Sequence, residues 1–290
     1  MRRVVRPSEP AEILMSGNAQ RSHLVLLDFS GTLSMGAVHF GSPENLSEAL
    51  RKSGLQSLGV RNSEEFWSRC IVPFWNRGGT SAIGYTALLE KALQERYTAS
   101  PEKALEGAEH FRRLYFGASR IDTPWKSLLE FLGASGKTTG IIATDHYMDA
   151  TEHIVKELER MNLRGISVKE SPNIPQGFLG IANSAELGFF KEEEGFWETL
   201  KGHIPYAGEN IFLVEDFGAN EPSGDVYGNS RRVLERRRKT GAHLRKVFRR
   251  SPGIFEFSLP RTYWKTPEIL MQECAVRAEN ITRRLKEALS

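Results

Sequence analysis

Short apolar runs alternate with segments of helical periodicity over two separate parts of the chain. The run at 24–27 is continuously apolar, which is typical of a strand buried on both faces of a parallel sheet. Further strands are predicted at 139–144, 180–182, 210–214 and 242–248. Helices are predicted between them at 125–132, 148–161, 193–201 and 225–239. This alternation favours an α/β fold, a Rossmann-like parallel sheet with helices on both faces.

Residues 36–120 have a different character, because they show helical spacing without a strong strand signal. The predicted helices there are 46–53, 64–74, 83–97 and 101–116. A last helix is predicted at 266–289. We therefore expect a lead-in at 1–22, an α/β core at 23–35 and 121–250, an inserted helical module at 36–120 and a C-terminal helical extension at 251–290.

Composition narrows the class of protein. Hydrophobic residues make up 40% and charged residues 26% of the 290 residues, which is ordinary for a globular protein. Two cysteines make no disulfide framework, and no apolar run approaches the ~18 residues of a membrane span. We therefore expect a cytoplasmic protein without a membrane partner.

The formal net charge of +3 does not by itself indicate a nucleic-acid partner. Ten lysines and arginines against a single acid lie between Arg231 and Arg250, however. That stretch could attract nucleic acid, although a solvated helix face is the simpler interpretation. The sequence does not indicate an oligomeric state.

Polar residues stand where the predicted strands end. Asp28 ends the first strand, Thr144 the second, and Glu215 and Asp216 follow the fourth, while Lys191 precedes a helix. In open α/β sheets, ligands bind beyond the carboxyl ends of the strands. The set offers a carboxylate for attack, a hydroxyl and an ammonium for phosphate oxygens, and an acid pair for a divalent cation.

Four segments resemble, in order, the four motifs of the haloacid dehalogenase-like superfamily. They are Asp28–Leu33, Gly140–Thr144, Ala182–Lys191 and Ile211–Asp216. The helical module follows the first motif, where this superfamily places a cap. The resemblance covers roughly residues 23–250, and it implies the fold of that superfamily with an inserted α-helical cap.

The resemblance also implies a chemistry. The chain would be a Mg²⁺-dependent hydrolase, in which Asp28 attacks the phosphorus of a small phosphorylated metabolite and forms an aspartyl-phosphate. Asp28, the backbone carbonyl of Ser30 and Asp216 would hold the Mg²⁺, with Glu215 assisting. Thr144 and Lys191 would bind phosphoryl oxygens and act in catalysis with Asp28 and Ser30. The expected substrate contacts are Gly31, Thr32, Thr144, Asp145, Lys191 and Arg77, the last from the module.

Ser30 departs from the pattern of the superfamily. Its phosphatases carry a second aspartate at this position, as general acid and base, and such groups typically contribute ~10²–10⁴-fold to the rate. Proton transfer should therefore suffer here, whereas metal binding through the backbone should not. His146 could take over the proton transfer, and Glu221 or Asp225 could supply a further acid.

Other functions stay open at this stage. Ser30 is compatible with a phosphonate or haloacid hydrolase, cleaving a carbon–phosphorus or carbon–halogen bond, and with a regulatory protein that kept the fold and lost turnover. A phosphonoacetaldehyde hydrolase needs a cap lysine, and the module offers only Lys52, Lys91 and Lys103. The acid pair after the fourth strand argues against a metal-independent dehalogenase. The aromatic residues Trp67, Phe74 and Trp75 are expected mostly in the core.

Overall fold

A computed structural model describes residues 21–204, 206–221, 230–260 and 266–290. In these residues six strands form one parallel sheet in the order β3-β4-β2-β1-β5-β6. The strands are β1 (Arg21–Leu27), β2 (Thr138–Thr144), β3 (Arg164–Ser167), β4 (Phe178–Asn183), β5 (Tyr206–Glu215) and β6 (Gly253–Glu256). The predicted α/β fold with a parallel sheet is confirmed.

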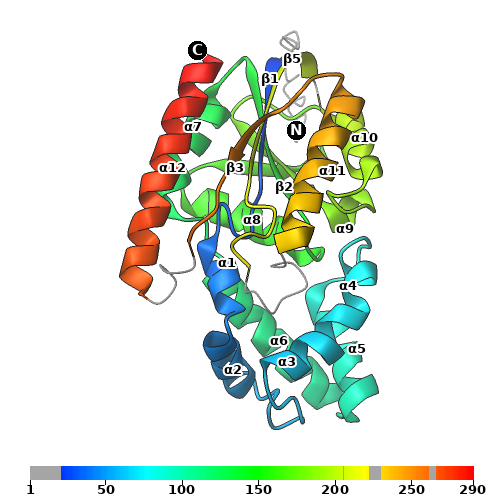
Figure 1. Cartoon of the computed structure of the whole chain (residues 1–290). Coiled ribbons are helices and arrows are strands. Elements are labelled where there is room, and N and C mark those ends of the chain that lie inside the picture. The colour runs from blue at the N-terminus through cyan, green and yellow to red at the C-terminus, as the bar shows by residue number, and fades with distance from the viewer. Residues whose placement is uncertain (1–20, 205, 222–229, 261–265) are drawn as a thin grey trace, which may run out of the picture.

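The central strand β1 is apolar on both faces because helices cover both sides of the sheet. Leu24 and Leu26 belong to one buried cluster, and Val25 and Leu27 to another, as the alternation of side chains along a strand requires. The first cluster contains residues of α10 (Glu194–His203) and α11 (Ser230–Phe248). The second contains residues of α7 (Lys126–Ala134), α8 (Asp149–Arg160) and α12 (Pro267–Leu289). Figure 1 shows α7 and α12 on one side of the sheet and α10 and α11 on the other.

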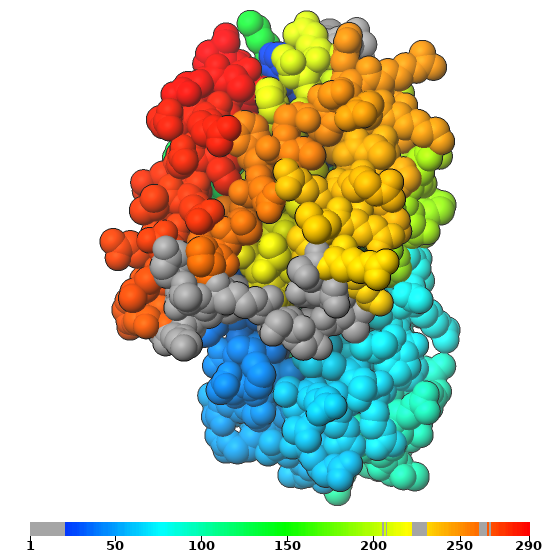
Figure 2. Space-filling model, viewed as in Figure 1, coloured from blue at the N-terminus to red at the C-terminus, as the bar shows by residue number. Residues whose placement is uncertain are grey.

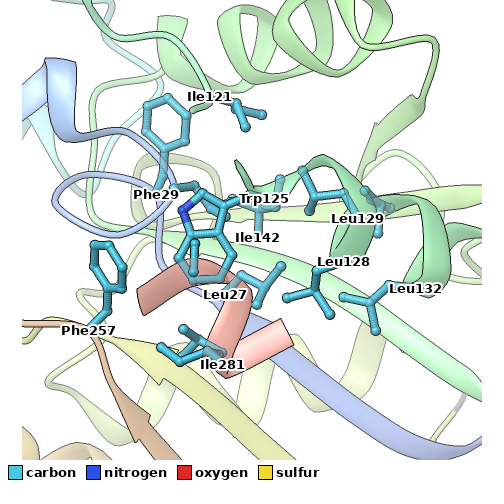
Figure 3. Packing of buried hydrophobic residues seen from close by; sticks show 14 of the residues in the cluster. Leu27, Phe29, Ile121, Trp125, Leu128, Leu129, Leu132, Ile142, Phe257 and Ile281 are labelled. Carbon is cyan, nitrogen blue, oxygen red and sulfur yellow. The ribbon is translucent and has the colours of Figure 1, made fainter. Parts of the chain in front are cut away.

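The C-terminal helix is part of this core. Ile281 of α12 packs in the same cluster as Leu27 of β1 and Trp125, which closes the short helix η2 (Thr123–Trp125) (Figure 3). The indole Nε1 of Trp125 donates a hydrogen bond of 2.9 Å to the carbonyl of Thr32. The buried indole therefore ties the loop that follows β1 to the apolar layer beneath it.

One predicted strand is wrong, and two strands of the sheet were not predicted. Residues 242–248 are the C-terminal half of α11, in which Leu244, Val247 and Phe248 are buried at helical spacing. The sheet is instead completed by β6, which pairs with β5 within the expected C-terminal extension. The edge strand β3 was not predicted either. Residues 225–229 of the predicted basic helix lie outside the described part of the chain.

Residues 35–118 form a helical unit with its own buried cluster, below the sheet in Figures 1 and 2. The unit contains α1 (Met35–Phe40), α2 (Pro43–Lys52), α3 (Ser63–Glu65), η1 (Phe66–Ile71), α4 (Val72–Gly78), α5 (Tyr85–Tyr97) and α6 (Pro101–Ala118). The turn η1 is wound as a π-helix. A π-helix bonds residues five positions apart, so Phe66 and Ile71 come onto the same face.

The helical unit joins the sheet unit through two adjacent connections. The N–H of Asp122 donates to the carbonyl of Leu33 at 2.8 Å, and the N–H of Met35 donates to the Asp122 carboxyl at 2.9 Å. A Cβ at Gly36 would lie 2.2 Å from the carbonyl oxygen of Ala118. Only glycine at this position allows the outgoing and returning segments to lie so close together.

Contacts away from the connections hold the helical unit against the strand ends. The N–H of Tyr85, at the start of α5, donates to the carboxylate of Asp149. The ring of Tyr85 stacks on Tyr147 with 4.6 Å between ring centroids, and Trp75 stacks on Phe190 at 5.7 Å. The two units therefore contact each other through a hydrogen bond and through stacked aromatic rings.

Within the described part of the chain, every helix is too short or too polar to span a membrane.

Candidate active site

Three buried carboxylates meet at the carboxyl ends of the neighbouring strands β1 and β5. Parallel pairing of Leu27 with Val214 sets Asp28, just after β1, level with Glu215 at the end of β5. The N–H of Asp28 continues this pairing and donates to the Val214 carbonyl at 2.9 Å. Oxygen atoms of Asp28, Glu215 and Asp216 all lie within 4.8 Å of one another.

Lys191 brings a single buried ammonium into this cluster. Its Nζ donates to Asp28 Oδ1 at 2.5 Å and to Glu215 Oε2 at 2.8 Å. Its backbone is held on both sides, since its N–H donates to Asp145 Oδ1 at 2.8 Å and its carbonyl accepts from the indole of Trp197 at 2.7 Å. The structure thus brings this lysine to the predicted site residues.

Burial and charge act on each titratable group of the cluster. Burial by itself would lower the pKa of Lys191, but the charges of Asp28, Glu215 and Asp145 outweigh it and raise this pKa. Burial, together with the charge of Asp28, raises the pKa of Glu215 and of Asp216. Partial burial also raises the pKa of Asp145 to about 6. Burial and the repulsion between carboxylates together therefore outweigh the attraction of the one ammonium for Glu215 and Asp216.

This imbalance fits a divalent cation. With all three carboxylates ionised, the cluster and Lys191 carry a net charge of −2 in a buried position. In addition, Asp28 Oδ2 is buried and has no hydrogen-bond partner among the residues that the structure describes. Hard divalent cations such as Mg²⁺ prefer oxygen ligands of this kind. The residues present therefore fit such an ion.

Backbone and amide groups hold Asp216 in place. Its Oδ1 accepts from the N–H of Gly218 at 2.8 Å and its Oδ2 from the N–H of Asn220 at 2.9 Å. The Asn220 side chain donates in turn to the carbonyls of Gly31 at 2.7 Å and Phe257 at 2.8 Å. Asn220 links the loops after β1 and β5 with the end of β6, and the sequence holds no local signal for this role.

Gly31 and Thr32 lie beneath the site and do not line its cavity. Gly31 has φ of +82°, and a Cβ there would come within 2.6 Å of Asp216 Oδ2, so glycine is needed for the close approach of the two loops. Thr32 is fully buried. In the structure these two residues shape the loop after β1, and their contacts with a substrate stay predictions.

Arg77 is not brought to the site either. It is exposed on α4, whereas Trp75 and Asn76 of the same helix line the cavity. A helix rotates by about 100° per residue, so Arg77 points to a different side. The two glycines after it serve packing, because a Cβ at Gly78 would meet Tyr147 at 2.5 Å and one at Gly79 would meet Phe190 at 2.5 Å.

Ser30 lies near Tyr115 of α6, and its hydroxyl lowers the pKa of that phenol against the larger, opposite effect of burial. The Tyr115 hydroxyl lies 2.8 Å from His146 Nε2. The N–H of Tyr147 donates to His146 Nδ1 at 2.8 Å, which assigns the proton of the neutral ring to Nε2. Burial lowers the pKa of His146 to about 3. Both ring nitrogens of this histidine are therefore engaged, and the ring is uncharged at neutral pH.

A cavity of about 320 Å³ lies between the strand ends and the helical unit. At one end it is lined by Asp28, Ser30, Thr144, Asp145, Lys191, Glu215 and Asp216. Glu221 lines it as well, whereas Asp225 lies outside the described residues. Trp67 and Trp75, expected mostly in the core, line the cavity, and Phe74 is buried in the cluster of the helical unit. The structure thus joins most of the predicted site residues in one space.

No protein-family model matches the chain, and no curated protein matches it. Among solved structures the chain is similar to a predicted HAD-like family hydrolase from Porphyromonas gingivalis, at 11% identity and a TM-score of 0.44. That likeness covers 88% of this chain and 98% of the other. At such values the likeness carries no information on function. The parallel sheet with its inserted helices agrees with the fold that the sequence motifs imply.

Proposed function

We propose that the chain is a Mg²⁺-dependent hydrolase of the haloacid dehalogenase-like superfamily, which releases phosphate from a small phosphorylated metabolite. One observation carries this proposal. Asp28 and Lys191 are hydrogen-bonded to each other beside Glu215 and Asp216 in a single buried site, although the chain separates them widely. A nucleophile, a cation for phosphoryl oxygens and a ligand set for a divalent metal are the groups that this chemistry needs.

Asp28 Oδ2, which accepts no hydrogen bond within the described part of the chain, would attack the phosphorus. The new bond from Oδ2 to phosphorus forms as the bond from phosphorus to the leaving oxygen breaks, and the departing alkoxide takes a proton. Water then attacks the phosphorus and the bond to Oδ2 breaks, which restores the carboxylate and releases phosphate and a proton. Lys191 offsets the negative charge that develops as a carboxylate approaches a phosphate.

The metal ion would be held by the three carboxylates, Asp28, Glu215 and Asp216, together with the carbonyl of Ser30. When bound, it supplies a positive charge that neutralises phosphoryl oxygens. Thr144, buried at the end of β2 and lining the cavity, would donate its hydroxyl to one of these oxygens. Asp145 holds the backbone of Lys191 and would act as a positioning residue.

The test is phosphate release from an aryl phosphate with Mg²⁺ and with chelator. Asp28→Asn should lower the rate by about 10³-fold or more, because it removes the nucleophile. Glu198→Gln, an exposed carboxylate on α10, is the matched control and should leave the rate unchanged. Release that survives either chelator or Asp28→Asn would overturn the proposed function.

Changing Ser30 to aspartate tests the proton transfer separately. If Ser30 limits protonation of the leaving group, Ser30→Asp should raise turnover by about tenfold or more, within the usual range for such groups. The gain should be largest for leaving groups of high pKa. An unchanged rate would mean that another group of the cavity, such as Glu221, already does this work.

No observation favours the alternative functions. Lys52 and Lys91 pair with Glu48 and Glu95 on the surface of the helical unit, and neither they nor Lys103 line the cavity. A Schiff base from that unit therefore has no lysine in place. The assay above also separates the remaining alternatives. A haloacid hydrolase would act in chelator, and a binding protein would not release phosphate at all.

A further inference from the structure

The helical unit lines the cavity with side chains that differ in polarity from those at the strand ends. This difference indicates which class of substrate the cavity would accept. Resting on the proposed function, we infer that the substrate is a phosphomonoester whose leaving group is an uncharged, apolar, ring-sized alcohol, with phenols preferred. The strand ends would hold the phosphoryl group, and the helical unit would enclose the ring.

The side chains that the helical unit contributes to the cavity carry no charge. They are Ala37, Phe40, Leu46, Phe66, Trp67, Ile71, Val72, Trp75, Asn76, Tyr85, Phe111 and Tyr115. All charged residues among those that line the cavity come from the sheet unit instead. The cavity is therefore divided into a charged end at the strands and an apolar end in the helical unit. Such a division fits a ligand with one anionic and one apolar end.

Aromatic rings form most of the apolar end. Phe66 packs on Phe111 with 4.8 Å between ring centroids, and Phe40 packs edge-on against Phe111 at 5.5 Å and against Tyr115 at 5.4 Å. Trp67 is only half-buried, so part of its indole faces the cavity. Rings pack best against other rings in offset or edge-on arrangements, and these walls offer both faces and edges.

The polar groups of this end are few compared with the hydroxyl groups of a sugar. Among the side chains that the helical unit contributes, hydrogen bonds can come from Asn76, the hydroxyls of Tyr85 and Tyr115, and the indole N–H groups of Trp67 and Trp75. The Tyr115 hydroxyl already bonds to His146. A polyol would therefore bury hydroxyl groups without partners, which is costly. The volume of about 320 Å³ lies at the low end for small-molecule sites, which favours a single ring or a small bicycle.

The neighbourhood of Asp28 points the same way. Ser30 lines the cavity next to the nucleophile, and a serine hydroxyl is a poor acid for protonating a leaving oxygen. A leaving group that is stable as an anion, as a phenolate is, depends least on such help. Both the shape of the apolar end and the chemistry beside Asp28 thus favour an aryl ester.

A matched pair of substrates tests the inference. Benzyl phosphate and glucose 6-phosphate are both primary alkyl phosphates with a six-membered ring, so they differ mainly in the polarity of the ring. With Mg²⁺, kcat/KM should be at least about 100-fold higher for benzyl phosphate, because a site with few partners rejects hydroxyl groups. Acetyl phosphate serves as a reference substrate that is too small to need the apolar end.

Variants of the wall locate the effect. Trp67→Ala should lower the ratio of kcat/KM for benzyl phosphate to that for acetyl phosphate about tenfold, mainly through KM, and Trp67→Phe should restore most of it. Leu105→Ala removes an exposed apolar side chain of α6 outside the cavity and should leave the ratio unchanged. Thermal unfolding checks that each variant is folded. If Trp67→Ala does not fold, inhibition of the unaltered protein by benzylphosphonate relative to inorganic phosphate gives the same information.

The outcomes separate the inference from the proposed function. Hydrolysis of acetyl phosphate without a preference for benzyl phosphate over glucose 6-phosphate would overturn the inference and leave the function standing. If phosphate is released neither from these three substrates nor from the aryl phosphate of the first assay, the proposed function is overturned and the inference with it. A preference for benzyl phosphate that Trp67→Ala does not reduce would show that the ring binds elsewhere, and would also overturn the inference.

Discussion

The charged side chains of the site balance one another's buried charges. Lys191 lies between Asp28 and Glu215, and its removal would leave three buried carboxylates without a cation. Breaking a buried ion pair by removing one partner typically costs about 3–5 kcal/mol, since the remaining charge is left uncompensated. We therefore expect the ammonium of Lys191 to contribute to the stability of the fold, in addition to its proposed role in catalysis.

In chelator, we expect Lys191→Met to lower the free energy of unfolding by about 3–5 kcal/mol. Adding Asp28→Asn to that variant should recover part of the loss, because one of the uncompensated charges is removed. Urea unfolding of both variants measures the effect. Equal stability of Lys191→Met and the unaltered protein would contradict the buried ion pair.

Gly31 gives a second prediction at this scale. Gly31→Ala combines a left-handed backbone with a clash against Asp216, and should cost about 1–3 kcal/mol. It should also weaken Mg²⁺ binding in calorimetry, because the clash moves a ligand. Gly54 has a similar φ of +79° and open space around it, so Gly54→Ala should show the backbone cost alone. Loss of Mg²⁺ affinity in both variants would contradict this account.

Some residues of the site could be predicted from the sequence around them, and others could not. Asp28, Thr144, Glu215 and Asp216 could be predicted because each lies at the end of an apolar strand or just after it, and a parallel sheet brings the ends of its strands together. Asn220 could not, because its role comes from contacts with segments far away in the sequence. The same holds for Tyr115, which sits in an ordinary amphipathic helix and meets the site only through the packing of the two units. The sequence also could not show that Trp67 and Trp75 line the cavity whereas Phe74 is buried in the core. Helical periodicity does not distinguish a side chain in the core from one in the wall of a cavity.

Elements with a long apolar pattern could be predicted better than short ones. The central strands are apolar on both faces and stand out from the sequence, whereas β3 and β6 are four-residue edge strands with several exposed or half-buried positions. The segment 242–248 was misread because Leu244, Val247 and Phe248 suit either a short strand or one face of a helix. Length decides between them, and α11 extends over 230–248.

Asp122, in the connection between the two units, should make the stability of the protein depend on pH. Burial raises the pKa of Asp122 to about 6 from an ordinary 3.8, and the N–H of Met35 offsets only part of this. Between these values the folded protein holds a proton that the unfolded chain releases, so stability falls as pH rises. The contribution is fully present below about pH 4 and is lost as pH rises through about 6, a change of up to about 3 kcal/mol.

Asp122→Asn keeps the hydrogen bond from Met35 and removes the titration. The difference in unfolding free energy between the unaltered protein and this variant should therefore change between pH 4 and pH 7, with the variant gaining relative to the unaltered protein as pH rises. Chemical denaturation at several pH values measures it. A difference independent of pH would show that Asp122 is ionised in the folded protein throughout this range.

The described residues form a sheet unit and a helical unit, which lie one above the other in Figure 2, and the cavity lies between them. Their approach depends on Gly79, where a Cβ would press on Phe190, the ring that stacks on Trp75. Gly79→Ala should therefore loosen this contact, raise KM for benzyl phosphate several-fold, and make tryptophan fluorescence easier to quench by acrylamide. Gly117→Ala, on an open part of α6, should change neither. Quenching that is identical in both variants would contradict the contact.

The chain enters and leaves the helical unit at almost the same point, where Gly36 touches the backbone of Ala118. For the sheet, everything between these two residues amounts to a single surface loop with closely spaced ends. Such a segment can be exchanged for another of any size whose own ends meet, without disturbing the pairing of the strands. Replacing this one continuous stretch of sequence would therefore change the part of the cavity wall that the helical unit forms. The residues at the strand ends would keep their positions.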